Sequence, residues 1–317
     1  MVDILMATYN GEKYIREQLD SILNQTYTNF TLHISDDKST DSTRKILKEY
    51  SKKDKRIILH FQDKNMGYIK NFEYLLTKST SDYVMFSDQD DVWLENKVEV
   101  SLNKIVNDKL DLVITNLFVV DKDLNLINDS YFNSININMN KDFELGNYLL
   151  RNPATGCTMI FNRKLVSKLL PFPHLKHPYC VHDWYIYIMG KCYGKVGVIK
   201  TPLIKYRQHG NNCIGMHKRN KWTFNFIRTV RAINLDYHID FCDELLTKIK
   251  NKSKDEIIEF RDYLINLRNA RWFNLKINYF FRYTKLVGFK FKLRYFIMFH
   301  FPFFFMSKPL KKVNNDD

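Results

Sequence analysis

The chain has 317 residues, of which 45% are hydrophobic, enough for the core of one large domain or two. Lysine and arginine total 49 against 35 acidic residues, so the net charge of +14 favours anionic partners: nucleic acid, nucleotide phosphates or an acidic membrane surface. The five cysteines form no CxxC pair, which argues against a disulfide framework and a zinc site. The N-terminus lacks a signal-peptide pattern and no segment reaches the about 18 apolar residues of a membrane span, so we expect a cytoplasmic protein.

Short apolar runs alternate with segments of helical period up to about residue 120. The expected strands are VDILMATY, FTLHIS, RIILHF, DYVMFS and LDLVITNLFVV, and the expected helices cover 14–23, Ser39–Tyr50, the surroundings of Phe72 and Leu75, and Leu94–Val106. This alternation predicts an α/β fold with a doubly wound, mostly parallel sheet flanked by helices.

The second half of the chain is patterned less regularly. TGCTMIFN is typical of a strand, HDWYIYIMG of a helix, and KVGVIKTPLIKYRQHG of strands and a loop. We therefore expect one domain over residues 1–215 and a helical C-terminal region over 216–317.

Ligands of such sheets lie beyond the carboxyl ends of the strands, which here are TYN at 8–10, SDD at 35–37 and SDQDD at 87–91. ATYN followed by Gly11 can offer backbone donors to an anion, although Asn10 as a helix cap explains it equally well. The chain has no GxGxxG after this strand and no GxxxxGK[ST], which argues against dinucleotide oxidoreductases and P-loop enzymes.

Acidic residues follow two of these strands. Asp36 or Asp37 can accept the imide N–H of a pyrimidine base, whereas capping and solvation are the ordinary alternative. In FSDQDDVW an extended chain would turn Asp88 and Asp90 to one side and Gln89 away, so that both carboxylates could bind Mg²⁺ or Mn²⁺. The alternative is an acidic loop that caps the helix expected from Leu94.

Two later motifs add candidate residues. Asp183 in VHDWYIY has an aromatic setting that can raise the pKa of a general base, although a helix cap is the commoner role. Arg207 and His209 in YRQHGNN suit a diphosphate, and His209 also suits a metal, whereas a single histidine is more often merely packed.

Together, ATYNG, SDDKSTD, NMGYIKNF, SDQDDVW, TGCTMIF, HDWY and YRQHGNN resemble the family 2 inverting glycosyltransferases of the GT-A fold, and within them bacterial rhamnosyltransferase-like enzymes. The resemblance covers about residues 1–215. It implies a nucleotide-sugar donor, with dTDP-rhamnose favoured and a UDP-hexose possible, a divalent metal, and a lipid-linked oligosaccharide acceptor in cell-surface polysaccharide synthesis.

The resemblance also implies roles for individual residues. It places the donor at Thr8, Tyr9, Asn10, Asp36, Asp37, Asn65, Gly67, Asn71, Asp91 and Arg207, the metal at Asp88, Asp90 and His209, the catalytic base at Asp183, and the acceptor at Thr155, Gly156, His182 and Trp184. Asp90 is the first choice as direct metal ligand. The ion would stabilise the departing diphosphate while Asp183 deprotonates the acceptor hydroxyl, so no second catalytic carboxylate is needed, unlike in a glycosidase.

The C-terminal stretch from Tyr263 to Asn315 has no acidic residue and eleven lysines or arginines, interleaved with Phe and Tyr. This composition suits a segment in an anionic membrane interface, and its apolar part, interrupted by His300 and Pro302, is too short to span. We expect a peripheral protein on the inner face of the cell membrane. The alternative is a C-terminal helix that packs its aromatic side chains on the domain.

Two rival functions fit part of the pattern. A nucleic-acid-binding protein would use the basic aromatic tail but would leave the acidic strand ends unexplained, so we expect no nucleic-acid partner. A sugar nucleotidyltransferase would share the sheet and the metal, but ATYNGEKY lacks the glycine-rich basic loop of that class.

Overall fold

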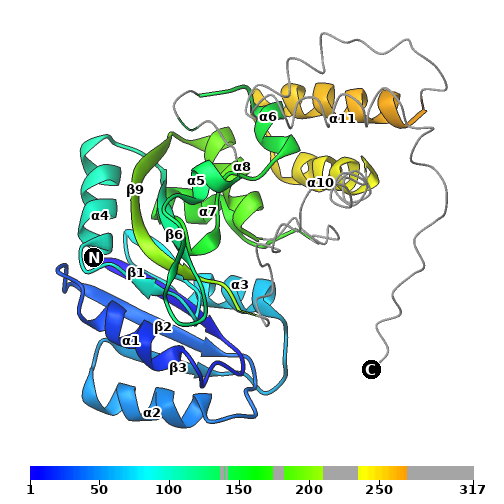
Figure 1. The fold of residues 1–317 in the computed structure, drawn as a ribbon. Helices are drawn as coiled ribbons and strands as arrows, with labels where there is room; N and C mark the ends of the chain where they lie inside the picture. Colours follow the sequence, from blue (N-terminus) through cyan, green and yellow to red (C-terminus); the bar gives the residue numbers. More distant parts are fainter. Residues whose placement is uncertain (136–138, 140–141, 174–181, 210–234, 270–317) are drawn as a thin grey trace, which may run out of the picture.

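The computed structural model describes residues 1–135, 139, 142–173, 182–209 and 235–269 (Figure 1). The first half contains β1 (Val2–Thr8), α1 (Ile15–Leu23), β2 (Phe30–Asp36), α2 (Thr43–Lys53), β3 (Ile57–Phe61), α3 (Tyr68–Lys78), β4 (Tyr83–Ser87), β5 (Val92–Trp93) and α4 (Lys97–Asn107). The rest contains β6 (Leu112–Val120), β7 (Leu126–Asn128), α5 (Tyr131–Ser134), α6 (Leu145–Leu150), the 3-10 helix η1 (Gly156–Thr158), β8 (Met159–Asn162), α7 (Arg163–Leu169), α8 (His182–Tyr193), β9 (Val196–Arg207), α10 (Leu235–Lys248) and α11 (Ser253–Asn269).

The strands form one sheet in the order β3-β2-β1-β4-β8-β6-β9-β5, and β7 pairs with β6 outside this path. The first four strands of this order are parallel, and β9 is parallel to β6. β8 enters antiparallel between β4 and β6, and β5 lies antiparallel to β9. The predicted α/β class with a mostly parallel sheet flanked by helices is confirmed.

Each face of the sheet carries its own hydrophobic core, because successive side chains of a strand point to opposite faces. On β1, Ile4 and Met6 belong to the core under α1, α2 and α4, whereas Leu5 belongs to the core under α3, α6, α7 and α8. The same alternation separates Met85 from Phe86 on β4.

Helices α10 and α11 lie side by side beside α6 (Figure 1) and contribute to the same core as α8. Trp184 of α8 contacts Phe241 of α10 with ring centroids 5.4 Å apart. The predicted boundary near residue 215 lies outside the described residues, as does the basic aromatic tail from 270 to 317. Within the part that the structure describes, no helix is long and apolar enough to cross a membrane.

Some element boundaries differ from those expected. The helix expected from Ser39 begins at Thr43, because Asp41 accepts a hydrogen bond from the Thr43 backbone N–H at 2.9 Å and ends the preceding turn there. The strands and loop expected near residue 200 are one long strand, β9, whose pairing with β6 shifts register.

The sheet brings distant polar segments to one edge. Thr8 pairs with Asp36 and Met6 with Ser87, so β1, β2 and β4 end beside one another. β9 reaches the same place by another route, since Lys205 pairs with Val92 just after the acidic loop. The carboxyl edge therefore gathers the motifs singled out in the sequence.

Candidate active site

The end of β1 is fastened to the acidic loop by Gln89. Its side-chain amide accepts from the Tyr9 N–H at 2.9 Å and donates to the Tyr9 carbonyl at 3.0 Å. A Cβ on Gly11 would lie 2.3 Å from Gln89 Oε1, so glycine leaves room for this contact. The Tyr9 side chain remains 46% exposed. Gln89 therefore fastens the backbone that carries the accessible Tyr9 ring at the carboxyl edge.

Three of the expected donor-binding residues make contacts within the protein. Asp36 is fully buried and accepts from Thr8 Oγ1 at 3.2 Å, from the Ser39 N–H at 3.0 Å and from the Arg44 guanidinium. Asn10 Oδ1 accepts from the Thr40 N–H at 2.9 Å. These hydrogen bonds join the loops after β1 and β2.

Asp37 holds the loop that follows β3. Its two carboxylate oxygens accept the N–H groups of Met66 and Gly67, each at 2.8 Å. Gly67 has φ of 79°, a conformation that glycine adopts without strain, and Asn65 Oδ1 accepts from its N–H at 3.0 Å. Asn71 lies buried on α3 and donates to the Ser35 carbonyl at 2.9 Å. Asp37 and the 65–67 loop therefore form one wall at the end of β2.

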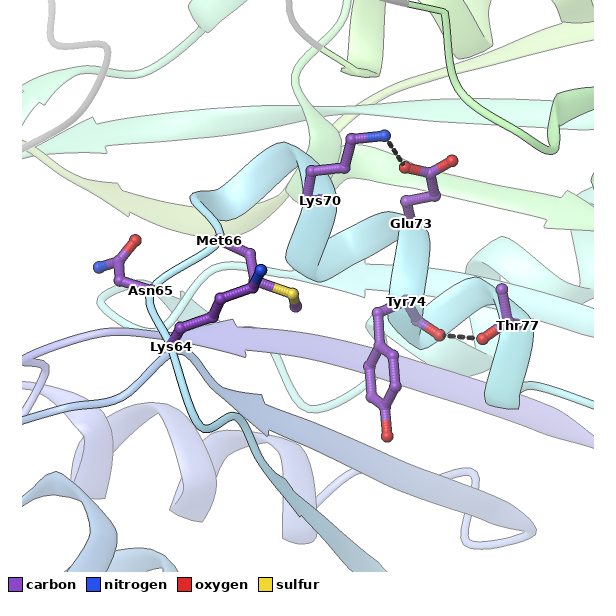
Figure 2. Close-up of a pocket in the computed structure, with 7 residues that line it drawn as sticks. All are labelled: Lys64, Asn65, Met66, Lys70, Glu73, Tyr74 and Thr77. Carbon is purple, nitrogen blue, oxygen red and sulfur yellow. Dashed lines mark hydrogen bonds and ion pairs between the residues drawn. The ribbon is translucent and has the colours of Figure 1, made fainter.

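A surface pocket of about 550 Å³ opens beside this wall (Figure 2). It is lined by Lys64, Asn65, Met66, Lys70, Glu73, Tyr74 and Thr77. Figure 2 shows the side chains of Lys70 and Glu73 turned toward each other, joined at 2.6 Å. The lining does not include the acidic loop or Asp183, so the pocket is a neighbour of the candidate site and not its centre.

The acidic loop begins where β4 ends, at Ser87, and the chain bends at residues 89 and 90, so the extended conformation expected for residues 88–90 is not formed. Ligand atoms of Asp88, Asp91 and Cys157 lie within 4.8 Å of one another. Burial, together with the charges of Asp90 and Asp183, raises the pKa of Asp88 to about 7. Burial also holds the pKa of Asp91 and that of the Cys157 thiol well above their usual values. A protonated thiol is a poor partner for a hard divalent cation.

Asp90 faces a different group. Its Oδ2 lies 2.8 Å from His209 Nε2, and both side chains are partly exposed. The contact is a hydrogen bond. A divalent cation could take the place of its proton, because neighbouring ligands of an octahedral Mg²⁺ or Mn²⁺ site are about 3 Å apart. The His209 ring also stacks on Tyr14, with centroids 4.9 Å apart. Asp90 of the acidic loop and His209, which follows β9, are therefore candidates to hold a metal between them.

Asp183 lies in the first turn of α8, in a buried, largely aromatic setting. It is 7% exposed, and its Oδ1 accepts from Asn152 Nδ2 at 3.0 Å and from the Trp184 N–H at 2.5 Å. Burial raises its pKa to about 7, while those two hydrogen bonds act in the opposite direction. A carboxylate in this state can take up a proton near neutral pH.

Two of the expected acceptor residues, His182 and Trp184, flank Asp183 on α8, and both are buried. His182 is buried, stacks on Phe72 with centroids 4.6 Å apart, and burial lowers its pKa to about 3, so it is neutral. A Cβ on Gly156 would lie 3.0 Å from His182 Nε2. Trp184 donates to the Tyr148 carbonyl at 2.7 Å. Thr155 Oγ1 lies 3.7 Å from Cys157 Sγ.

Several residues of the site had no functional signal in the sequence: Tyr14, Glu17, Gln89, Asn152 and Cys157. Gln89 could have been suspected because it interrupts three aspartates. Tyr14 and Glu17 lie on or beside α1, far in sequence from β9, and only the fold brings them to Arg207 and His209.

The profile of the family described as Glycosyl transferase family 2 matches residues 3–170. The dTDP-rhamnosyl transferase RfbG of Shigella flexneri is 30% identical over 264 residues, covering 79% of this chain and 85% of that protein. The UDP-Glc:alpha-D-GlcNAc-diphosphoundecaprenol beta-1,3-glucosyltransferase WfgD of Escherichia coli is 29% identical and covers 59% of this chain and 68% of that protein.

Solved structures show the same fold. TarS 1-349 of S. aureus superposes with a TM-score of 0.58 at 18% identity, covering 85% of this chain and 72% of that chain. The mannosyltransferase PcManGT from Pyrobaculum calidifontis, in complex with GDP-Man and Mn2+, gives 0.52 at 18% identity, covering 83% and 69%. The sheet order and these neighbours identify a GT-A-like fold. The chain belongs to glycosyl transferase family 2.

Proposed function

We propose that the protein is an inverting, metal-dependent glycosyltransferase that moves a sugar from a nucleoside diphosphate to a lipid-linked oligosaccharide in cell-surface polysaccharide synthesis. The observation that carries the proposal is Asp183: a buried carboxyl with a pKa near 7, interacting electrostatically with the acidic loop that contains Asp90. Asp183 suits a general base, and Asp90 suits a ligand of a cation. In a single displacement on an anomeric carbon, the base would act on the acceptor hydroxyl and the cation on the departing diphosphate.

In the proposed reaction Asp183 takes the proton from the acceptor hydroxyl as that oxygen attacks the sugar. Asn152 keeps Asp183 oriented and partly offsets the effect of burial on its pKa. Asp90 and His209 would hold Mg²⁺ or Mn²⁺, which supplies positive charge to the departing diphosphate. Tyr9, with its exposed ring, and Asp37 would bind the nucleoside.

The donor and the acceptor are proposed from the relatives. RfbG, by its name, transfers rhamnose from dTDP, and WfgD, by its name, uses UDP-glucose and a diphosphoundecaprenol-linked acceptor. We favour dTDP-rhamnose, with a UDP-hexose as the second choice. The tail composition supports attachment to the inner face of the cell membrane, and that localisation stays a prediction.

A donor screen tests the function. Purified protein is incubated with dTDP-rhamnose, UDP-glucose or UDP-galactose, lipid extract and Mn²⁺ or Mg²⁺, and released nucleoside diphosphate is measured with and without EDTA. We expect release with one donor, dependent on acceptor and abolished by EDTA. Release at an unchanged rate in EDTA would contradict the metal assignment, and no release from any donor would contradict the proposed donor class.

Membrane attachment has a separate test, in which full-length protein and a chain ending at Arg282 are sedimented with anionic vesicles. We expect only the full chain to sediment, and less of it as salt rises. Aggregation of the shorter chain, or its loss of nucleotide binding, would instead assign the aromatic tail to the core.

A further inference from the structure

The guanidinium of Arg207 is buried beneath the acidic loop. The side chain is 1% exposed and is among the largest fully buried side chains of the described residues. A buried cation is costly unless charge and hydrogen bonds compensate it, so its partners indicate what holds it there.

All three guanidinium nitrogens donate to groups of the protein. Nε donates to the Asp90 carbonyl at 2.8 Å, Nη1 to the Lys122 carbonyl at 2.7 Å, and Nη2 to the Glu17 carboxylate. The guanidinium also lies 4.5 Å from the centre of the Tyr14 ring. Arg207 thus ties the acidic loop, α1 and the turn between β6 and β7 to the end of β9.

The backbone of Arg207 adds a further contact, since its N–H donates to Asp91 Oδ1 at 3.1 Å. Asp90 is therefore held through its own carbonyl while its carboxylate faces His209. The Tyr14 ring contacts both Arg207 and His209, and the second contact holds the His209 ring in place.

We propose that Arg207 is a positioning residue that fixes Asp90 and His209 for the metal, and that it is not a ligand of the donor diphosphate. This inference rests on the proposed function. Glu17 is its counter-charge, with a side chain 53% exposed on α1. Lysine cannot replace Arg207, because an ammonium carries its donors on one nitrogen, whereas the three partners here are reached from three separate nitrogens of the planar guanidinium.

A diphosphate ligand and a positioning residue would affect nucleotide affinity differently. A diphosphate ligand would contribute to nucleotide affinity with or without metal. A residue that only positions Asp90 and His209 contributes to the gain in affinity that the metal provides.

The experiment measures the Kd of dTDP and of UDP by calorimetry, first without metal and then with saturating Mn²⁺, for wild type, Arg207→Lys, Arg207→Met and Glu17→Gln. We expect metal-free affinities within about twofold of wild type. The gain in affinity from Mn²⁺ should fall at least tenfold in both Arg207 variants and about threefold in Glu17→Gln. In the double variant Glu17→Gln/Arg207→Met, the loss of this gain should differ from the sum of the two single losses in free energy.

Glu49→Gln is the matched control, because Glu49 of α2 forms an exposed ion pair, at 2.8 Å, with Arg16 of α1, the helix that also carries Glu17. It should keep the full gain from Mn²⁺. Glu17→Gln keeps the test decisive if the Arg207 variants do not fold, since Glu17 is half exposed.

Equal loss of affinity with and without metal in an Arg207 variant would make Arg207 a diphosphate ligand and overturn the inference. An unchanged gain in Glu17→Gln would also overturn it. Both results leave the proposed function intact. If wild type binds neither nucleotide with Mn²⁺, the proposed function fails and the inference fails with it.

Discussion

Asp90 and Asp183 are the same residue type at one edge of the same sheet, yet their surroundings differ. Asp90 is partly exposed, pairs with His209 and is held by Arg207 through its backbone. Asp183 is buried and accepts a hydrogen bond from the Asn152 side chain. A partly exposed carboxylate beside an imidazole suits a metal ligand, whereas an enclosed setting suits a carboxyl that gains and loses a proton. The comparison shows how environment assigns two roles.

Asp183→Asn should have the largest effect. We expect transfer to fall by about 1,000-fold, because an amide cannot accept the acceptor proton, while the Kd for the nucleotide stays within about twofold. Single-turnover transfer and calorimetry measure the two quantities. Comparable loss of nucleotide affinity would move Asp183 from chemistry to structure and break the comparison.

Asp90→Asn should reduce transfer by about 100-fold, since an amide is a weaker partner for a divalent cation and for the departing charge. In contrast to Asp183→Asn, the variant should bind nucleotide more weakly with Mn²⁺ present and normally in EDTA. Raising the Mn²⁺ concentration should restore part of the rate. A variant whose rate does not respond to Mn²⁺ would contradict the role given to Asp90.

Gly11→Ala extends the comparison to the nucleoside end of the site. The new methyl group would meet the Gln89 amide, so Tyr9 should lose its two hydrogen bonds, and nucleotide affinity should fall about tenfold. Gln89→Ala removes both the side chain that the new methyl group would meet and the two hydrogen bonds to Tyr9. Adding Gly11→Ala to Gln89→Ala should therefore reduce nucleotide affinity little further. A large additional loss of affinity would show that Gly11→Ala acts through a contact other than Gln89.

The smallest expected effect is a shift in the pH dependence of transfer, which tests the environment of Asp183 directly. Because Asp183 acts deprotonated, kcat/KM should rise with pH and be half maximal near pH 7. Asn152→Ala removes a hydrogen bond that favours the charged form, so the midpoint should move up by about half a pH unit. Rate measurements from pH 5.5 to 9 test this, and a downward shift would contradict the assignment.

Much of the fold could be predicted from the sequence. Continuous apolar runs, typical of strands buried on both faces, and helical segments of period 3.6 are local patterns. β1, β2 and β4 follow the first, and α1 follows the second. Strand ends could be located for the same reason, so the carboxyl edge and its aspartates were identifiable before any contact was known.

The partners within the site could not be predicted. Gln89 contacts Tyr9 across 80 positions, and Arg207 contacts Glu17 across 190. Arg207 and Asp91 look like donor ligands in a linear pattern, whereas the fold turns the Arg207 guanidinium and the Asp91 carboxylate inward. Sequence pattern records residue type and spacing, but not the direction in which a side chain points after the strands pair.

The sequence by itself determined the α/β class, the polar strand ends and the family, because these depend on local periodicity and on motifs in order. Only the tertiary structure decided that Asp88 groups with Asp91 and Cys157 while Asp90 groups with His209. The reason is physical: burial and the distance between charges set the state of each carboxylate, and both quantities exist only after the chain has packed.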